Sequence, residues 1–232
     1  MSLTISLTIK FFFETVTMQP EFWHDRWQRN ETAFHEGAPN PFLVEHFAKL
    51  KLSPGSRVFV PLCGRTVDIH WLLAQGAHVA GAELSQLAID QLFSDLGQSP
   101  VITPTGDLLQ YSAPNIDIFV GNIFSLTPHL LGHIDAIYDR AALVALPKPM
   151  RDQYTTHLKA LTSNAPQLLI TFDYDQSQID GPPFSINADE VHHHYATSYD
   201  ISPLATHPIP NGLKGKCPAS ESAWLLVGQS HT

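Results

Sequence analysis

The feature that most constrains the fold is an apolar segment that ends in a single glycine, followed by a second apolar segment that ends in an acid. Residues 57–65 read RVFVPLCGR, and Glu83 closes the next apolar segment. A glycine lets the backbone approach a ligand closely, and the start of the following helix offers N–H groups to it. An acid at the tip of the second strand can accept hydrogen bonds from a ribose diol. The pattern therefore predicts half of a nucleotide-binding α/β unit and an adenosine-containing ligand.

The glycine pattern leaves a second interpretation open. A dinucleotide fingerprint has three glycines spaced as Gly-x-Gly-x-x-Gly, whereas this loop has only Gly64. An ordinary strand–turn–helix would look the same, and Glu83 would then be a solvated residue at the end of a strand.

Composition excludes several classes of protein. The 232 residues suit one α/β domain with additions, and 44% of them are hydrophobic, which is ordinary for a globular protein. The formal net charge is −9, with 22 acidic against 13 basic residues, and no basic stripe appears. A nucleic-acid backbone and an anionic membrane are therefore not expected partners. The two cysteines, Cys63 and Cys217, form no metal-binding pair and predict a reducing cytoplasm.

The first residues differ from the rest of the chain. Residues 1–17 read MSLTISLTIKFFFETVT, in which Lys10 and Glu14 interrupt an apolar run that is too short to span a bilayer. The segment lacks the basic start and the small-residue cleavage site of a signal peptide. Because Met18 follows it, we expect residues 1–17 to be a disordered or non-native extension and residues 18–232 to form one domain.

Strand-like and helix-like periodicities alternate along the chain. Nearly continuous apolar runs predict strands at 58–63, 78–84, 116–122, 134–138, 168–174 and 223–227, and residues 101–115 suggest a hairpin. Helical spacing predicts helices at 21–30, 41–50, 67–75, 85–96 and 143–161, and another helix that starts after Asn187. The alternation predicts an α/β protein whose mostly parallel sheet has helices on both faces.

Four residues fall at or just after the carboxyl ends of predicted parallel strands: Leu62, Glu83, Asn122 and Arg140. In open α/β sheets ligands bind at this edge. The convergence of the four residues on one edge therefore predicts a binding site there.

Six stretches resemble the thiopurine S-methyltransferase family in its bacterial form. They are FWHDRW (22–27), TAFH (32–35), RVFVPLCGRTVDIHWL (57–72), GAELS (81–85), YDRAALVAL (138–146) and GPPFS (181–185). The resemblance implies a Rossmann-like fold that uses S-adenosylmethionine as cofactor, with a seven-stranded sheet whose last strand is antiparallel. It also implies methyl transfer to the sulfur of a thiopurine or another aromatic or heterocyclic thiol and, by analogy, to selenium or tellurium compounds.

The resemblance further implies which residues form the site. Cofactor-binding positions of the family match Trp27, Leu62, Glu83 and Arg140, positions beside the adenine match Asn122 and Ile123, and an aromatic position near the acceptor matches Phe34. We add Gly64, because the backbone of its loop should approach the methionine part of the cofactor.

The roles of these side chains are not fixed by residue type alone. Arg140 suits the cofactor carboxylate, an anionic acceptor, or a salt bridge to its neighbour Asp139. Trp27 and Phe34 suit the walls of a pocket beside the sulfonium, although a helix packed on the core would also place tryptophan at position 27. We expect no general base, because an acidic thiol arrives largely ionised.

The run His192-His193-His194 invites a metal interpretation. Consecutive residues of a helix point to different faces, so three of them cannot hold one ion without distortion. We therefore expect a partly solvated helix and no metal site.

The carboxyl end departs from the family pattern. Where family members often carry an aromatic–acid–basic stretch, residues 216–226 read KCPASESAWLL, without a clear basic residue to hold an acceptor. This keeps open a cofactor-binding protein without thiopurine activity. A nicotinamide-dependent oxidoreductase shares the ribose-binding acid but needs more glycines, and a hydrolase would need a G-x-S-x-G elbow, which is missing. A monomer is the default expectation.

Overall fold

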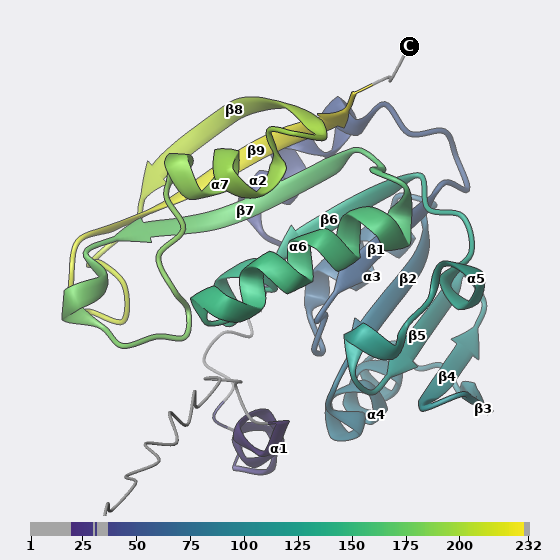
Figure 1. The fold of residues 1–232 in the computed structure, drawn as a ribbon. Helices are drawn as coiled ribbons and strands as arrows, with labels where there is room; N and C mark the ends of the chain where they lie inside the picture. Colours follow the sequence, from purple (N-terminus) through teal and green to yellow (C-terminus); the bar gives the residue numbers. More distant parts are fainter. Residues whose placement is uncertain (1–19, 30, 32–36, 230–232) are drawn as a thin grey trace, which may run out of the picture.

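The computed structural model describes residues 20–29, 31 and 37–229. Its centre is a nine-stranded sheet in the order β3-β4-β5-β2-β1-β6-β7-β9-β8 (Figure 1). The strands are β1 (Arg57–Pro61), β2 (His78–Glu83), β3 (Val101–Thr105), β4 (Leu108–Ala113), β5 (Ile116–Val120), β6 (Ala136–Arg140), β7 (Gln167–Tyr174), β8 (Tyr199–Pro208) and β9 (Ala219–Gly228). The five strands from β5 to β7 in this order are parallel, and the outer strands are antiparallel to their neighbours.

Helices cover both faces of the sheet (Figure 1). They are α1 (Pro20–Gln28), α2 (Pro41–His46), α3 (Val67–Ala74), α4 (Gln86–Asp95), α5 (Pro128–Leu131), α6 (Lys148–Thr162) and α7 (Ala188–Tyr195). Short 3₁₀ turns are η1 (Phe47–Leu50), η2 (Ile123–Ser125), η3 (Leu143–Ala145) and η4 (Gln176–Gln178). The predicted fold class, an α/β sheet with mostly parallel central strands, is confirmed.

The central strands are apolar because both of their faces are buried. In β1, Val58 and Val60 pack with side chains of α2, α3 and α4, whereas Phe59 packs with side chains of α5, α6 and α7. Successive side chains of a strand point to opposite faces, so one short segment contributes to two cores.

Local sequence signals set where several helices begin. The side chain of Ser85 accepts a hydrogen bond from the backbone N–H of Ala88, and Asn187 does the same for Glu190. Such N-caps satisfy the first free N–H groups of a helix. Both helix starts were predicted from the sequence, and the caps confirm them.

The sheet is two strands larger than the seven-stranded sheet implied by the resemblance. Residues 101–113 form the suspected hairpin β3–β4, which adds to the edge at β5. At the other edge, β9 runs antiparallel to β7, as the resemblance implied.

Strand β8 was missing from the sequence-based prediction. It contains Pro203 and Pro208, and proline usually argues against a strand because it lacks an N–H group. Here β8 is the edge strand, and its pairing with β9 is irregular between Pro203 and Ala205. A proline is tolerated at such an edge.

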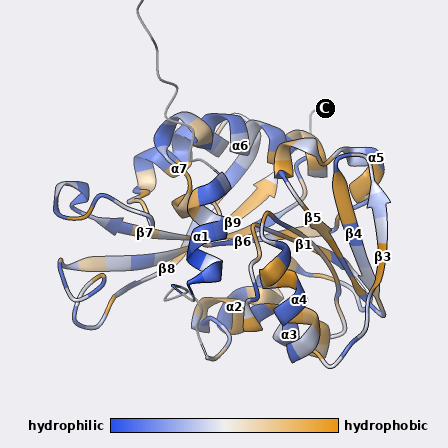
Figure 2. Ribbon diagram, turned by 90° about the horizontal axis from the view of Figure 1, so that it is seen from below, coloured by the Kyte–Doolittle hydropathy of each residue, from blue (hydrophilic) through white to orange (hydrophobic). Residues whose placement is uncertain are grey.

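Helix α1 lies across the ends of the central strands, between the helices of the two faces (Figure 2). It contacts α4, and the Trp27 ring packs against Gly64, just beyond the carboxyl end of β1. Two predictions, for residues 1–17 and for Phe34, lie outside the described residues. Within the described part of the chain, no helix is long and apolar enough to cross a membrane.

Candidate functional site

The carboxylate of Glu83 connects the loop after β1 with the loop after β2. Both loops lie where the parallel strands of the sheet end, which we call the carboxyl edge. One oxygen accepts a hydrogen bond of 2.8 Å from the backbone N–H of Gly64, and the other accepts one of 2.8 Å from the backbone N–H of Ser85. Glu83 is only 6% exposed, so it is not the solvated strand-end residue of the alternative interpretation. Each oxygen keeps a second lone pair, which a ribose hydroxyl can use.

Burial governs the charge of Glu83. It raises the pKa of this carboxyl above its usual value, while the backbone N–H groups of Ser85, Gly64 and Leu84 act in the opposite direction. Burial is the larger of the two effects, so the three donors reduce the rise in this pKa but do not cancel it.

The loop after β1 has the conformation that the glycine predicted. Leu62 and Gly64 both have positive φ, at 46° and 51°. We expected N–H groups at the start of the helix to face a ligand. The N–H of Gly64 instead donates its hydrogen bond to Glu83. Helix α3 begins only after Thr66, whose side chain accepts from the backbone N–H of Asp68.

The side chain of Trp27, from α1, packs against the loop after β1. A Cβ placed on Gly64 would lie 3.1 Å from Cζ2 of Trp27, so a larger residue would require the indole to move by a few tenths of an ångström. Trp27 is 3% exposed, so it packs as a core residue, and it does so against the candidate site. Its role beside a sulfonium stays a prediction.

The loop after β5 is also held to Glu83, through the backbone. The N–H of Gly121 donates to the carbonyl of Glu83 at 2.8 Å, and Gly121 has a φ of 138°. Asn122 follows, exposed, with its side chain accepting a hydrogen bond from the backbone N–H of Phe124. Ile123 is buried. The two positions therefore differ: Asn122 is exposed to solvent, and Ile123 packs in the hydrophobic core.

Arg140 lies at the end of β6 on the same face as Tyr138. Its positive charge acts against burial and the charge of Asp68, which together raise the pKa of Tyr138 well above the usual value. The neighbouring Asp139 points to the other face and accepts hydrogen bonds from Tyr154 Oη (2.7 Å) and the Leu143 N–H (3.2 Å). The acid considered as a partner of Arg140 thus points away from the face that Arg140 occupies.

A buried polar network beneath Arg140 escaped the sequence analysis. Tyr138 Oη donates to Asp68 at 2.9 Å, the N–H of Asn40 donates to the same carboxylate at 2.7 Å, and the Asn40 amide donates to Glu221 at 3.1 Å. Its members come from four distant segments, and the folded sheet with its covering helices brings them together.

A basic side chain missed by the sequence analysis also reaches this region. Lys214, in the loop between β8 and β9, donates to the carbonyl of Pro182 at 2.7 Å. Burial lowers the pKa of Lys214, and the nearby charges of Arg26 and Lys216 lower it further. Lys214 thus places a positive charge beside the turn at 181–183 and near Arg26 of α1. The stretch 216–226 itself departs from the family pattern.

These residues fit an adenosine-containing cofactor. Glu83 offers a buried, backbone-held carboxylate to a diol, and the loop of Leu62 and Gly64 has the backbone shape that permits close approach. Trp27 provides an aromatic wall beside that loop, suited to a sulfonium.

Two hollows are lined by other residues than those of this site. The larger, of about 510 Å³, is lined by residues 128, 132–135 and 161–166. These segments precede β6 and β7, so this hollow is at the amino ends of parallel strands, where ligands of such sheets rarely bind. The smaller lies between α6 and α7.

Comparison with known proteins gives a consistent picture. The family model described as Thiopurine S-methyltransferase (TPMT) matches residues 18–212. The protein named thiopurine S-methyltransferase from Xanthobacter autotrophicus is 55% identical over 210 residues, covering 90% of this chain and 99% of that protein. Its namesake from Gluconobacter oxydans is 50% identical over 203 residues, covering 88% and 92%.

Solved structures support the fold. A 1,6-didemethyltoxoflavin-N1-methyltransferase from Burkholderia thailandensis, with bound 1,6-didemethyltoxoflavin and S-adenosylhomocysteine, has a TM-score of 0.60 at 15% identity, covering 90% of this chain and 87% of that chain. A SAM-dependent methyltransferase from Anabaena variabilis has a TM-score of 0.58 at 15% identity, covering 90% and 95%.

Proposed function

This chain belongs to the thiopurine S-methyltransferase family, and from that premise we propose that it transfers a methyl group from S-adenosylmethionine to the sulfur of a small aromatic or heterocyclic thiol. The observation that supports this proposal most directly is the buried Glu83 carboxylate, held by Gly64 and Ser85 at the carboxyl edge. A nucleoside cofactor requires such an acceptor for its ribose.

The cofactor supplies an electrophilic methyl group on a sulfonium. Glu83 would hold the ribose hydroxyls, the loop of Leu62 and Gly64 the methionine part, and Asn122 and Ile123 the adenine. Trp27 would exclude water from the sulfonium side, because its buried ring already covers Gly64. Displacement at the methyl carbon needs the attacking and leaving atoms in line, so the work of these residues is positioning.

The acceptor would arrive as a thiolate, so no side chain is assigned as general base. Arg140 at the end of β6 and Lys214 beside the 181–183 turn provide positive charge for an anionic acceptor or for the cofactor carboxylate. Phe34 is proposed to contact the acceptor. The same charge would suit oxyanions of selenium or tellurium as alternative acceptors.

Calorimetric titration with S-adenosylhomocysteine, followed by a turnover assay, tests the proposal. We expect micromolar binding that the Glu83→Ala variant weakens, and methylation of a thiopurine thiol by the wild-type protein. Absence of binding at millimolar ligand, with the protein folded, would contradict the cofactor assignment. The same titration with a nicotinamide dinucleotide addresses the oxidoreductase alternative, which family membership disfavours.

A second candidate is a protein of this family that binds the cofactor but does not act on thiopurines. The divergent stretch 216–226 favours it, because this stretch lacks a clear basic residue to hold an acceptor. Tight S-adenosylhomocysteine binding without turnover on thiol, selenite or tellurite acceptors would establish it.

We further propose that residues 18–232 form one catalytic unit that acts as a monomer in the cytoplasm, with residues 1–17 as an extension. Two free, buried cysteines support a reducing compartment. Light scattering of the purified chain tests the oligomeric state.

A further inference from the structure

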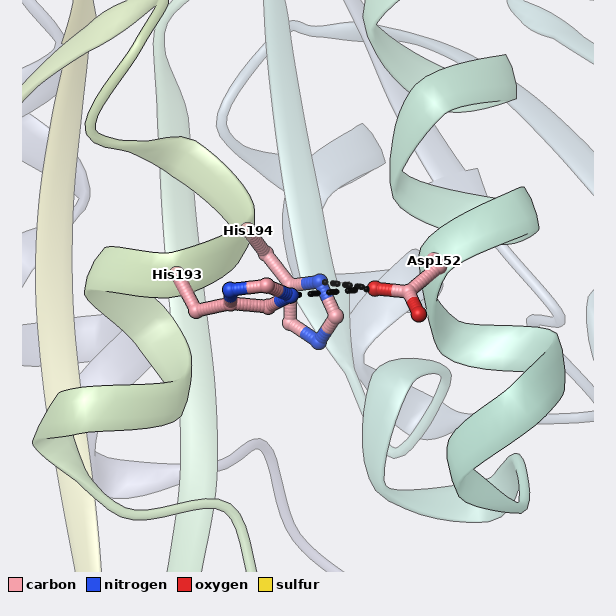
Figure 3. A group of neighbouring side chains, drawn as sticks. All are labelled: Asp152, His193 and His194. Carbon is pink, nitrogen blue, oxygen red and sulfur yellow. Dashed lines mark hydrogen bonds and ion pairs between the residues drawn. The ribbon is translucent and has the colours of Figure 1, made fainter.

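Two neighbouring histidines of α7 converge on an aspartate of α6 (Figure 3). The Nε2 atom of His193 lies 3.3 Å from Oδ1 of Asp152, and the Nδ1 atom of His194 lies 3.4 Å from the same oxygen. The three candidate ligand atoms all lie within 4.8 Å of one another. The two helices are far apart in sequence, and this contact is one place where they meet.

Adjacent helical residues reach one point here because they use different ring nitrogens. His193 extends its distal Nε2, whereas His194 presents its proximal Nδ1. His192 is turned away, with its Nδ1 2.8 Å from the carbonyl of Ala188. The sequence-based argument that three consecutive histidines cannot share an ion therefore holds for His192, but it does not exclude a pair completed by another helix.

The two separations between histidine and aspartate fit a tetrahedral metal ion, and they also fit long hydrogen bonds. Zinc binds imidazole nitrogen and carboxylate oxygen at about 2.0–2.2 Å, so two ligands of a tetrahedral site lie about 3.3–3.5 Å apart. Hydrogen bonds between a cationic N–H and a carboxylate are shorter, at about 2.7–2.9 Å. The two separations from Asp152 of 3.3 and 3.4 Å match the first case and are long for the second.

The surroundings of His194 supply what a metal-binding imidazole needs. Its second nitrogen, Nε2, lies 3.4 Å from Oε1 of Glu190, and Arg151 Nε lies 2.8 Å from the same oxygen. A carboxylate on the far nitrogen fixes the tautomer that leaves Nδ1 free to bind metal. Thr155 Oγ1, also 3.4 Å from Nδ1, is the competing neighbour.

Space and charge permit a further ligand. A hollow of about 380 Å³ adjoins the cluster, lined by Lys148, Asp152, Asn187, Asp189, Glu190, His193 and His194. Three carboxylates there outnumber the ammonium group of Lys148 and the Arg151 guanidinium that pairs with Glu190, so the hollow favours a cation. His194 is 3% exposed, whereas His193 and Asp152 are 70% and 63% exposed, so solvent can reach the fourth position.

We propose that Asp152, His193 and His194 form a site for a divalent transition-metal ion of the zinc type, with Glu190 as supporting carboxylate and water as fourth ligand. The ion would fasten α6 to α7. This site shares no residue with the candidate cofactor site and does not depend on the proposed function.

Zinc titration of the untagged, chelator-treated full-length protein tests the proposal. We expect one zinc ion per chain by calorimetry with a micromolar or lower dissociation constant, and a higher melting temperature with zinc. Cobalt(II) at the same site should give the intense visible absorption of a tetrahedral complex. The His193→Ala and Asp152→Ala variants remove exposed ligands without opening the core, and each should weaken zinc binding at least about tenfold.

His192→Ala is the matched control, since it removes a neighbouring exposed histidine that lies outside the cluster. It should bind zinc as the wild type does. The proposal is overturned if wild-type protein binds no zinc at millimolar concentration, or if His193→Ala and Asp152→Ala bind as tightly as His192→Ala.

Discussion

The carboxylate of Glu83 holds the backbone of Gly64 at 2.8 Å, so the acid at the end of β2 fixes the glycine loop at the end of β1. Two features that the sequence presented separately, an acid and a turn, are one structural unit. A substitution at either position should therefore affect both the loop and any ligand bound to it.

Replacing Glu83 by alanine should weaken S-adenosylhomocysteine binding by about 1.5–3 kcal/mol, since hydrogen bonds to a charged group contribute about this much. Calorimetry gives the affinity, and circular dichroism checks that the variant is folded. Glu45→Ala, at an exposed acid of α2, should leave the affinity unchanged. Equal affinities for the wild type and a folded Glu83→Ala variant would remove Glu83 from the site.

Replacing Gly64 by alanine should lower the free energy of unfolding by about 1–2 kcal/mol through its positive φ alone. The added Cβ would also press on Trp27, so α1 should dock less well. Gly55→Ala is the matched control, because Gly55 also has a positive φ but a Cβ placed on it would meet nothing within 4 Å. Chemical denaturation compares the two, and equal losses would show that the Trp27 contact contributes nothing.

The buried Asp139 should make stability depend on pH. Burial raises its pKa to about 6 from an ordinary 3.8, although hydrogen bonds from Tyr154 and two backbone N–H groups oppose this. The folded state therefore binds the proton more tightly than the unfolded state, and stability falls as pH rises from about 4 to about 6. A pKa difference of this size corresponds to about 3 kcal/mol.

Denaturation of Asp139→Asn across the same pH range checks this, because an amide cannot titrate. The variant should lose the part of the decline that Asp139 causes, while other groups titrate alike in both proteins. A Tyr154→Phe variant removes a hydrogen bond to the carboxylate and should move the decline to higher pH. An unchanged profile in Asp139→Asn would rule out the assignment.

Replacing Arg140 by alanine should reduce kcat/KM about tenfold or more, since hydrogen bonds to charged partners contribute about 1.5–3 kcal/mol. The affinity for S-adenosylhomocysteine, measured alongside, separates a role at the cofactor carboxylate from a role at the acceptor. Arg57→Lys, at the amino end of β1, is a control at the opposite edge of the sheet. Full activity in Arg140→Ala would exclude both roles.

The sequence predicted those parts of the structure that local chemistry determines. The apolar runs of the central strands, the caps at Ser85 and Asn187, and the turn at Gly64 each require particular residue types. Strand β8 escaped because its prolines are compatible with a strand only at an edge, and edge position is a property of the whole sheet.

Contacts between distant segments were beyond the sequence analysis for the same reason. The carboxylate of Asp68 meets Tyr138 and Asn40 only because β1 and β6 are neighbours with α2 and α3 on one face. Likewise, the histidine run of α7 gains Asp152 only through the packing of α6 beside it. A pattern within one helix carries no information about the helix that will lie opposite.

Because Trp27 packs on Gly64, the apparent affinity for the proposed cofactor should depend on the fraction of molecules in which α1 is docked. Gly64 lies between the indole and the Glu83 carboxylate, so detachment of the helix removes a wall from the loop that Glu83 orders. When only a fraction of molecules is competent to bind, the apparent dissociation constant increases by the inverse of that fraction. Conditions that detach α1 should then weaken the measured binding, even though no residue in contact with the ligand has been substituted.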